Sequence, residues 1–252
     1  MADTDQPRDY VASAFRLDAV RAAKAGTSVA VIVPARDEAA TLPLVLRAAL
    51  AHEELVDELI VVDDHSRDAT ALEALRHGAK VIENEGPSGK GAAMAAGVAA
   101  SSSDVIVFLD GDVRNMSPDY VGRLLQPLLE HPSVRLVKGY YERPLFNHPT
   151  GGGRVNDLTA RPILALLFPG LDRVRQPLAG ESALRRSLLE HVTFEPGYGV
   201  EIALLIDVAR AYGLGAIAEV DLGVREHRNR SLDELRPMAE EILRVALRRA
   251  RS

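Results

Sequence analysis

Five consecutive apolar residues, 105–109, lead directly into Asp110-Gly111-Asp112. A short apolar run without alternation indicates a strand buried on both faces, and such strands belong to parallel sheets covered by helices. Two carboxylates at the end of a buried strand are costly unless a cation lies beside them. Carboxylate oxygens suit Mg²⁺ or Mn²⁺, and Mg²⁺ usually binds one or two carboxylates together with substrate phosphates. The alternative is a tight Asp-Gly turn with solvated acids.

Strands and helices alternate along the chain. In the first half, periodicity predicts helices at residues 10–25, 39–51, 69–77 and 91–100, and strands at 29–33, 59–62 and 80–83. This order indicates βαβ units, and therefore an α/β fold with a mostly parallel, Rossmann-like central sheet and helices on both faces. In the second half we expect helices at 118–130, 157–168, 199–212 and 232–251, strands at 134–141, 176–183 and 216–222, and a flexible loop with a basic end at 148–154.

Polar clusters follow three of the predicted strands, at residues 34–38, 63–66 and 110–112. In parallel α/β sheets, ligands bind outside the carboxyl ends of the strands. One such cluster could arise by chance, but three on one sheet edge indicate a site. We expect a nucleotide-type ligand there.

Composition excludes several classes of protein. The net charge of −6 argues against non-specific nucleic-acid binding, and the absence of cysteine excludes disulfides and thiolate metal sites. No segment approaches the roughly 20 apolar residues of a membrane span, and residues 1–8 are polar, unlike a signal peptide. We therefore expect a soluble, cytoplasmic protein without nucleic-acid or membrane partners.

The polar clusters, together with Gly89-Lys90-Gly91, resemble the nucleotide-sugar domain of GT-A glycosyltransferases. This domain is similar to that of glycosyltransferase family 2. Later segments, at 137–141, 151–155, 176–181, 197–201 and 221–229, strongly resemble the glucosyl-3-phosphoglycerate synthases. The resemblance covers about residues 29–230. It implies transfer of glucose from UDP-glucose to 3-phosphoglycerate with retention of configuration. It further implies one continuous GT-A domain, with an N-terminal helix (1–27), a nucleotide-sugar-binding half (28–115) and an acceptor-binding half with the C-terminal helix (116–252).

The resemblance assigns a Mg²⁺ or Mn²⁺ ion to Asp112 and His227, with Asp110 on the ribose or an ordered water. His227 alone would be interpreted as a surface residue. For the UDP-sugar, the resemblance implies contacts by Pro34, Ala35, Arg36, Glu38, Ser66, Lys90, Asp110, Gly111 and Gly180.

Several of these residues have other interpretations. Glu38 at a helix start could interact with the helix dipole, and Ser66 could cap a helix from about residue 67. Lys90 between glycines before a helix suits a phosphate or uracil contact. Residues 86–91 superficially resemble a Walker A loop, but the spacing is two residues short and no Ser or Thr follows the lysine, which excludes a P-loop.

The resemblance implies that the acceptor is a small, strongly anionic molecule. Glycines let backbone N–H groups converge on an anion and arginine offers a bidentate fork, so Gly153 and Arg154 suit a phosphate. The alternative is a flexible surface loop. The resemblance adds Asn156, where relatives carry a hydroxyl residue, and Tyr198, Arg225 and Asn229.

We expect no protein nucleophile. Glu201, in an apolar helix entry, is interpreted as a contact to sugar hydroxyls, and Glu181 as a possible cap for a following helix. The resemblance implies a catalytic set of Asp112, Glu201 and His227, and a front-face substitution in which the leaving phosphate oxygen accepts the acceptor's proton.

Two alternatives remain. One is another GT-A transferase, using GDP-mannose as donor, or glycerate or another small acceptor. The other is a catalytically silent nucleotide-sugar-binding protein. Relatives are dimeric, so a homodimer is expected by resemblance.

Overall fold

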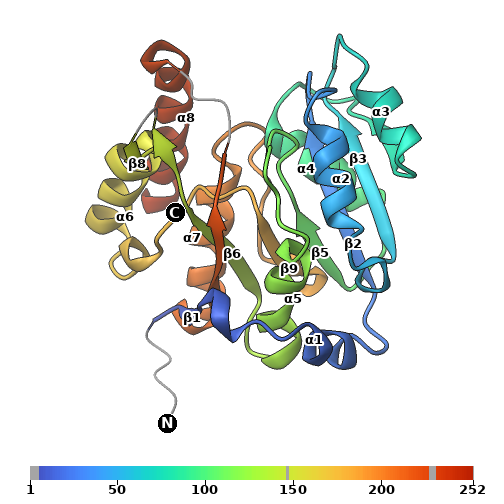
Figure 1. Cartoon of the computed structure of the whole chain (residues 1–252). Helices are drawn as coiled ribbons and strands as arrows, with labels where there is room; N and C mark the ends of the chain where they lie inside the picture. The colour runs from blue at the N-terminus through green and yellow to red at the C-terminus, as the bar shows by residue number, and fades with distance from the viewer. Residues whose placement is uncertain (1–5, 146–147, 227–230, 252) are drawn as a thin grey trace.

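The computed structural model describes residues 6–145, 148–226 and 231–251. One sheet runs through the molecule in the order β1-β10-β6-β9-β5-β2-β3-β4 (Figure 1). Its strands are β1 (Arg8–Tyr10), β2 (Val29–Ala35), β3 (Glu58–Asp63), β4 (Lys80–Glu83), β5 (Val105–Phe108), β6 (Leu136–Glu142), β9 (Ser182–Arg185) and β10 (Ile217–Val224). Neighbouring strands are parallel except at β9, which runs antiparallel to both β5 and β6. The mostly parallel α/β sheet predicted from the sequence is confirmed.

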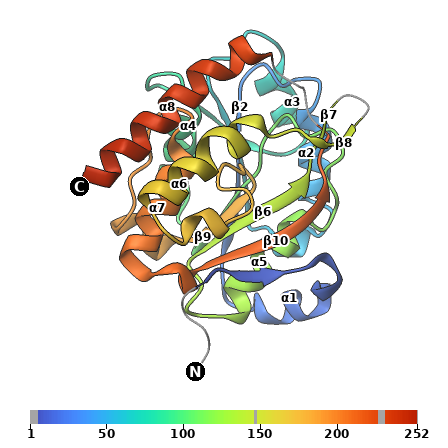
Figure 2. The ribbon, with the colours of Figure 1, turned by 90° about the vertical axis from the view of Figure 1, so that its left-hand side faces the viewer.

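Helices cover both faces of this sheet (Figures 1 and 2). One layer contains α1 (Leu17–Ala23), α2 (Leu42–Ala49), α3 (Thr70–Arg76) and α5 (Tyr120–Glu130). The other contains α4 (Lys90–Ala99), α6 (Arg161–Leu167), α7 (Val200–Tyr212) and α8 (Leu232–Arg251).

Strand β2 shows why the central strands are apolar throughout. Val29, Val31 and Val33 pack into the core on one face, while Ala30 and Ile32 pack into the core on the other. Successive side chains of a strand point to opposite faces, so burial of both faces requires an uninterrupted apolar run.

The carboxyl ends of β2, β3 and β5 lie at one edge of the sheet. Ala35 is in register with Asp63, and Ile32 is in register with Phe108. The three polar clusters that follow these strands are thereby brought to the same edge, as the sequence predicted.

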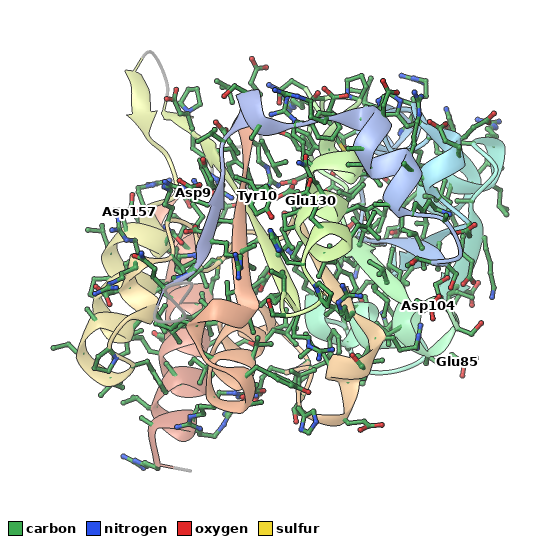
Figure 3. All side chains as sticks on the ribbon, turned by 90° about the horizontal axis from the view of Figure 1, so that it is seen from below. Asp9, Tyr10, Glu85, Asp104, Glu130 and Asp157 are labelled. Carbon is green, nitrogen blue, oxygen red and sulfur yellow. The ribbon has the colours of Figure 1, made fainter. Side chains whose placement is uncertain are left out.

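The helix predicted at residues 10–25 begins later than expected, and its first residue belongs to a strand. Residues 8–10 form β1, which lies beside β10 (Figure 3). Tyr10 is in register with Val220. A 3₁₀ turn at Ala12–Ala14 follows, and the helix spans only Leu17–Ala23. Pairing with the open edge of β10 outweighs local helix propensity here, because it supplies backbone hydrogen bonds that a short helix cannot match.

The region before β9 also differs from the prediction. The strand expected at 176–183 begins only at Ser182, and part of the expected flexible loop forms a hairpin of β7 (Pro144–Leu145) and β8 (His148–Gly151). The expected helix at 157–168 is divided. A π-helical turn at Asn156–Ala160 leads into α6, whose first turn holds Pro162, where a missing N–H costs least.

Glu219 on β10 is a buried carboxyl group, with only 5% of its surface exposed. Its Oε1 accepts the backbone N–H of Arg175 at 2.7 Å. Burial raises the pKa of Glu219 to about 7, and the hydrogen bond and charge of Arg175 counteract this only partly.

Replacement of Glu219 by glutamine should change how stability depends on pH. The pKa is higher in the folded than in the unfolded protein, so the wild-type free energy of unfolding should fall as pH rises from about 4.5 to 7. Glutamine can still accept the Arg175 N–H. We expect E219Q to be more stable than wild type at pH 8, by up to about 3 kcal/mol, and equal at pH 4.5 in urea titrations. An equal difference at both pH values would contradict this explanation.

Candidate active site

A cavity of about 630 Å³ lies at the edge of the sheet where β2 and β5 end. The first half of the chain contributes residues 34–38, 88–90 and 110–112 to its lining. The second half contributes residues 153–156 and 197–198, and helix α8 adds apolar side chains, including Leu235 and Met238. Residues from both halves of the chain therefore surround one space.

Most of the predicted site residues line this cavity. They are Pro34, Ala35, Arg36, Glu38, Lys90, Asp110, Gly111, Asp112, Gly153, Arg154, Asn156, Tyr198, Glu201 and Arg225. Ser66 and Gly180 are not part of its lining. His227 and Asn229 lie outside the described residues.

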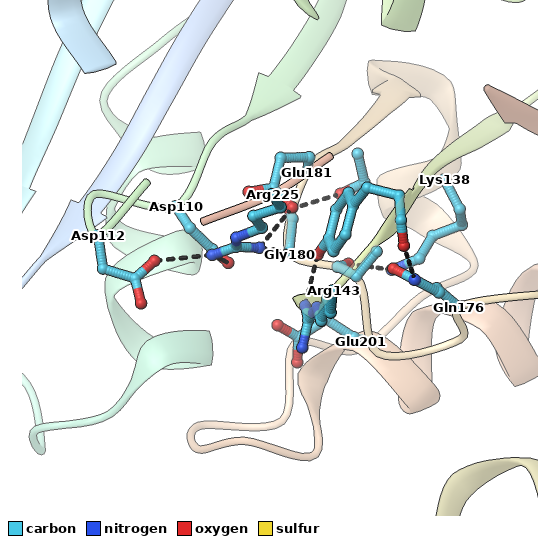
Figure 4. A network of polar contacts seen from close by, with 12 residues as sticks. Asp110, Asp112, Lys138, Arg143, Gln176, Gly180, Glu181, Glu201 and Arg225 are labelled. Carbon is cyan, nitrogen blue, oxygen red and sulfur yellow. Dashed lines mark hydrogen bonds and ion pairs between the residues drawn. The ribbon is translucent and has the colours of Figure 1, made fainter. Parts of the chain in front are cut away.

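Two cations hold the Asp110 carboxylate, and one of them, Arg225, is labelled in Figure 4. Lys90 Nζ lies 2.6 Å from Asp110 Oδ1, and the same ammonium group lies 2.6 Å from Glu201 Oε1. Arg225 Nη2 lies 2.9 Å from Asp110 Oδ2. Burial alone would raise the pKa of Asp110, but the charges of Lys90 and Arg225 outweigh it and hold that pKa well below its usual range. Asp110 is therefore ionised.

Arg225 also reaches the second acid of the pair, with Nη2 2.7 Å from Asp112 Oδ1. The guanidinium group thus spans the two aspartates, as expected where close carboxylates need a cation. The oxygen-only character of this pair suits a hard divalent ion. Within the described residues, no group of three or more His, Cys, Asp or Glu could hold a metal.

The start of helix α4 is held by the segment that precedes α7. The N–H groups of Gly91 and Ala92 donate to the carbonyls of Gly197 and Pro196, at 3.3 and 2.8 Å. A Cβ at Gly91 would lie 1.7 Å from the Glu195 carbonyl oxygen, so only glycine permits this close approach. The helix N-terminus is therefore capped by backbone carbonyls of the protein itself, and the contact of Lys90 with a phosphate or uracil stays a prediction.

Gly180 and Glu181 have roles that the sequence did not suggest. A Cβ at Gly180 would lie 2.1 Å from Asp110 Oδ1, so this glycine makes room for the aspartate. Glu181 caps no helix, because β9 follows it. Its side chain is fully buried, and its Oε2 lies 2.8 Å from Arg225 Nη1. Burial raises the pKa of the Glu181 carboxyl, and the charge of Arg225 counteracts that shift.

Ser66 supports the loop after β2. Its Oγ accepts the N–H of Asp37 at 3.1 Å, and its own N–H donates to Asp63 Oδ1. Helix α3 begins only at Thr70, so Ser66 is not its N-cap. The Glu38 carboxylate accepts a hydrogen bond from the Thr41 hydroxyl at 2.8 Å, just before α2.

Asp64 is a cavity residue that was not selected from the sequence. Its carboxylate accepts hydrogen bonds from Asn84 Nδ2 at 2.6 Å and from the Ser88 hydroxyl and Gly89 N–H, both at 2.9 Å. These bonds outweigh burial and lower the pKa of Asp64. The paired aspartates at the end of β3 were the available signal.

The predicted acceptor residues come from separate elements. The Asn156 amide lies buried, where Nδ2 donates to the Arg175 carbonyl at 3.1 Å and Oδ1 accepts the Leu178 N–H at 3.4 Å. Gly153 has a φ of 79°, a conformation that favours glycine. The turn before α6 therefore depends both on this glycine and on the Asn156 hydrogen bonds.

Residues 30–192 match the family model described as glycosyl transferase family 2. The chain is also 46% identical over 245 residues to a glucosyl-3-phosphoglycerate synthase of Mycobacterium tuberculosis, a match that covers 91% of this chain and 76% of the relative. The chain belongs to the glucosyl-3-phosphoglycerate synthase family. The recognition made from the sequence motifs is confirmed.

Solved structures of this family are similar along nearly the whole chain. The M. tuberculosis synthase in complex with Mn²⁺, UDP-glucose and phosphoglyceric acid is 44% identical with a TM-score of 0.90, covering 97% of this chain and 88% of that one. The same synthase with Mg²⁺ and UDP gives 43% identity and a TM-score of 0.89, covering 97% and 86%. The GT-A fold expected for this chain is confirmed.

Replacement of Lys90 by methionine tests the charge network directly. The variant keeps the length of the side chain but leaves Asp110 and Glu201 without their shared cation. Removing one partner of a buried ion pair should lower the free energy of unfolding by about 3 kcal/mol, measured in urea. Lys80→Met is the matched control, because Lys80 is exposed and its replacement should change the free energy of unfolding by less than about 0.5 kcal/mol. Equal losses in the two variants would refute the network.

Proposed function

We propose that the protein transfers glucose from UDP-glucose to 3-phosphoglycerate, giving glucosyl-3-phosphoglycerate and UDP. The observation that carries this proposal is the single cavity that joins the acidic pair at the end of β5 to Arg154 and Tyr198. The M. tuberculosis member of the same family binds Mn²⁺, UDP-glucose and phosphoglyceric acid together.

Asp112 and His227 would hold a Mg²⁺ or Mn²⁺ ion. The described part of the site fits such an ion, because Asp110 and Asp112 present carboxylate oxygens that already accept a guanidinium group. When bound, the ion neutralises charge on the diphosphate as UDP departs. Asp110, fixed by Lys90, would contact the ribose or an ordered water.

The donor half, residues 28–115, would hold the uridine. Pro34, Ala35, Arg36 and Glu38 follow β2 and line the cavity. Arg36 donates to the Ser88 hydroxyl at 2.7 Å, which connects it to the Asp64 network. Ser66, which lies outside the lining, would act through the backbone of Asp37.

The acceptor half, residues 116–252, would hold 3-phosphoglycerate. Gly153 and Arg154 face the cavity beside Asn156, and a glycine-arginine turn suits a phosphate. Tyr198, Arg225 and Asn229 complete the proposed acceptor set. Arg225 lines the same cavity, where its Nη2 lies beside Asp110 and Asp112.

A front-face substitution with retention agrees with the carboxylates present. Glu181 is fully buried and paired with Arg225, so it is not available as a nucleophile. Glu201 lines the cavity but lies 2.6 Å from the Lys90 ammonium group, which suits a fixed contact to sugar hydroxyls. The protein would then contribute positioning and electrostatics. A trapped glycosyl-enzyme on Glu201 would overturn this proposal.

Two further expectations stay predictions: a homodimer and a cytoplasmic location. Leu158 and Leu166 are 76% and 77% exposed, and they offer apolar area for contact with a second copy. No helix within the described residues is both long enough and apolar enough to cross a bilayer.

One assay separates the candidate functions. The purified protein should convert UDP-glucose and 3-phosphoglycerate to UDP and a glucosylated product when Mg²⁺ or Mn²⁺ is present. GDP-mannose as donor and glycerate as acceptor should react far more slowly, because glycerate lacks the phosphate. NMR of the product should show the α-anomer. Preference for GDP-mannose or glycerate would favour another GT-A transferase, and donor binding without turnover would favour a silent binding protein.

Arg154→Ala should raise the KM for 3-phosphoglycerate by at least about tenfold and leave the KM for UDP-glucose nearly unchanged. Loss of a charge-assisted phosphate contact costs about 1.5–3 kcal/mol, which explains the size of the effect. Arg161→Ala, at the exposed start of α6, is the control and should change neither constant. An unchanged acceptor KM in R154A would remove Arg154 from the acceptor site.

A further inference from the structure

Arg225 is held at both ends of its guanidinium group (Figure 4). Only 3% of its side chain is exposed. At the inner end, Nη1 donates to Glu181 Oε2 at 2.8 Å and to the Tyr141 hydroxyl at 2.7 Å. At the cavity end, Nη2 bridges Asp110 and Asp112. The inner contacts, to Glu181 and Tyr141, hold the guanidinium group in place independently of Asp110 and Asp112.

Glu181 is an unusual partner for such an arginine. The carboxylate is fully buried, and within the described residues its Oε1 has no hydrogen-bond partner. A buried carboxylate with one empty oxygen is costly. The ion pair with Arg225 is therefore the interaction that compensates the buried Glu181 carboxylate.

The bridge places a cation on Asp112, the carboxylate that is proposed to hold a divalent ion. Arg225 Nη2 lies 2.7 Å from Asp112 Oδ1, and Asp112 is the more exposed acid of the pair, at 30% against 18% for Asp110. Two cations on one carboxylate repel each other. A divalent ion that binds Asp112 must therefore work against the charge of Arg225.

We propose that Arg225 is an internal counter-cation that competes with the divalent metal for Asp112, and that Glu181 is the positioning residue that moderates this competition. The inference rests on the proposed function, since metal use is part of it. Without metal, Arg225 keeps the two aspartates compensated. Glu181 draws charge toward the inner end of the guanidinium group and so weakens its hold on Asp112.

The two variants R225Q and E181Q should change metal affinity in opposite directions. The Mn²⁺ dissociation constant is measured by electron paramagnetic resonance of free Mn²⁺, with donor and acceptor absent. Removing the competing cation in R225Q should tighten Mn²⁺ binding by about tenfold. Removing the more distant negative charge in E181Q should weaken it by about threefold. If Arg225 only supported the metal ligands, R225Q would instead bind Mn²⁺ more weakly.

Arg76→Gln is the matched control, because Arg76 is an exposed arginine on α3 paired with Glu73. Its Mn²⁺ affinity should stay within about twofold of wild type. If R225Q fails to fold, the double variant R225Q/E181Q removes both charges of the buried pair and should bind Mn²⁺ more tightly than E181Q. Weaker or equal binding there would overturn the competition, and wild-type affinity in E181Q would overturn the role of Glu181.

Wild-type glucosyl transfer, measured separately, distinguishes the two failures. If the wild type transfers glucose but R225Q has the Mn²⁺ affinity of the wild type, only the competition is refuted. If R225Q and E181Q shift the Mn²⁺ affinity in opposite directions but the wild type transfers no glucose, only the proposed reaction is refuted.

Discussion

The Asp110 carboxylate, held between Lys90 and Arg225, is the interaction on which the site depends. Lys90 comes from the start of α4, Arg225 follows β10, and Asp110 follows β5. Three segments that are distant in sequence are thus joined by opposite charges in a mostly buried place. Because each buried charge is tolerated only with its partners, the arrangement fixes the relative positions of these segments.

Contacts within the helix layer that contains α4, α7 and α8 reinforce this arrangement. The carbonyls of residues 196 and 197 cap α4, and Glu195 pairs with Arg249 near the end of α8. Arg249 also pairs with Asp207 of α7. The basic end of α8 therefore stabilises the segment that packs against Gly89 and Gly91. The position of Lys90 depends in turn on that segment.

The predictions succeeded where local chemistry is decisive. A short apolar run such as 105–109 indicates a strand covered on both faces, and polar clusters that follow parallel strands meet at one edge of the sheet. They failed where a distant partner decides. Residues 8–10 became a strand because β10 offers an edge, and Ser66 serves the loop of Asp37 rather than a helix start. Gly180 accommodates Asp110, a contact that no local pattern encodes.

The sequence by itself determined the α/β class, the acidic pair and the family, because periodicity and short motifs are local properties of the chain. Only the tertiary structure decided which charges meet. Glu181, Arg225 and Lys90 lie far apart in the chain, and each becomes a partner of the acidic site through strand order and helix packing. Electrostatic pairing depends on distance in space, and the fold sets that distance.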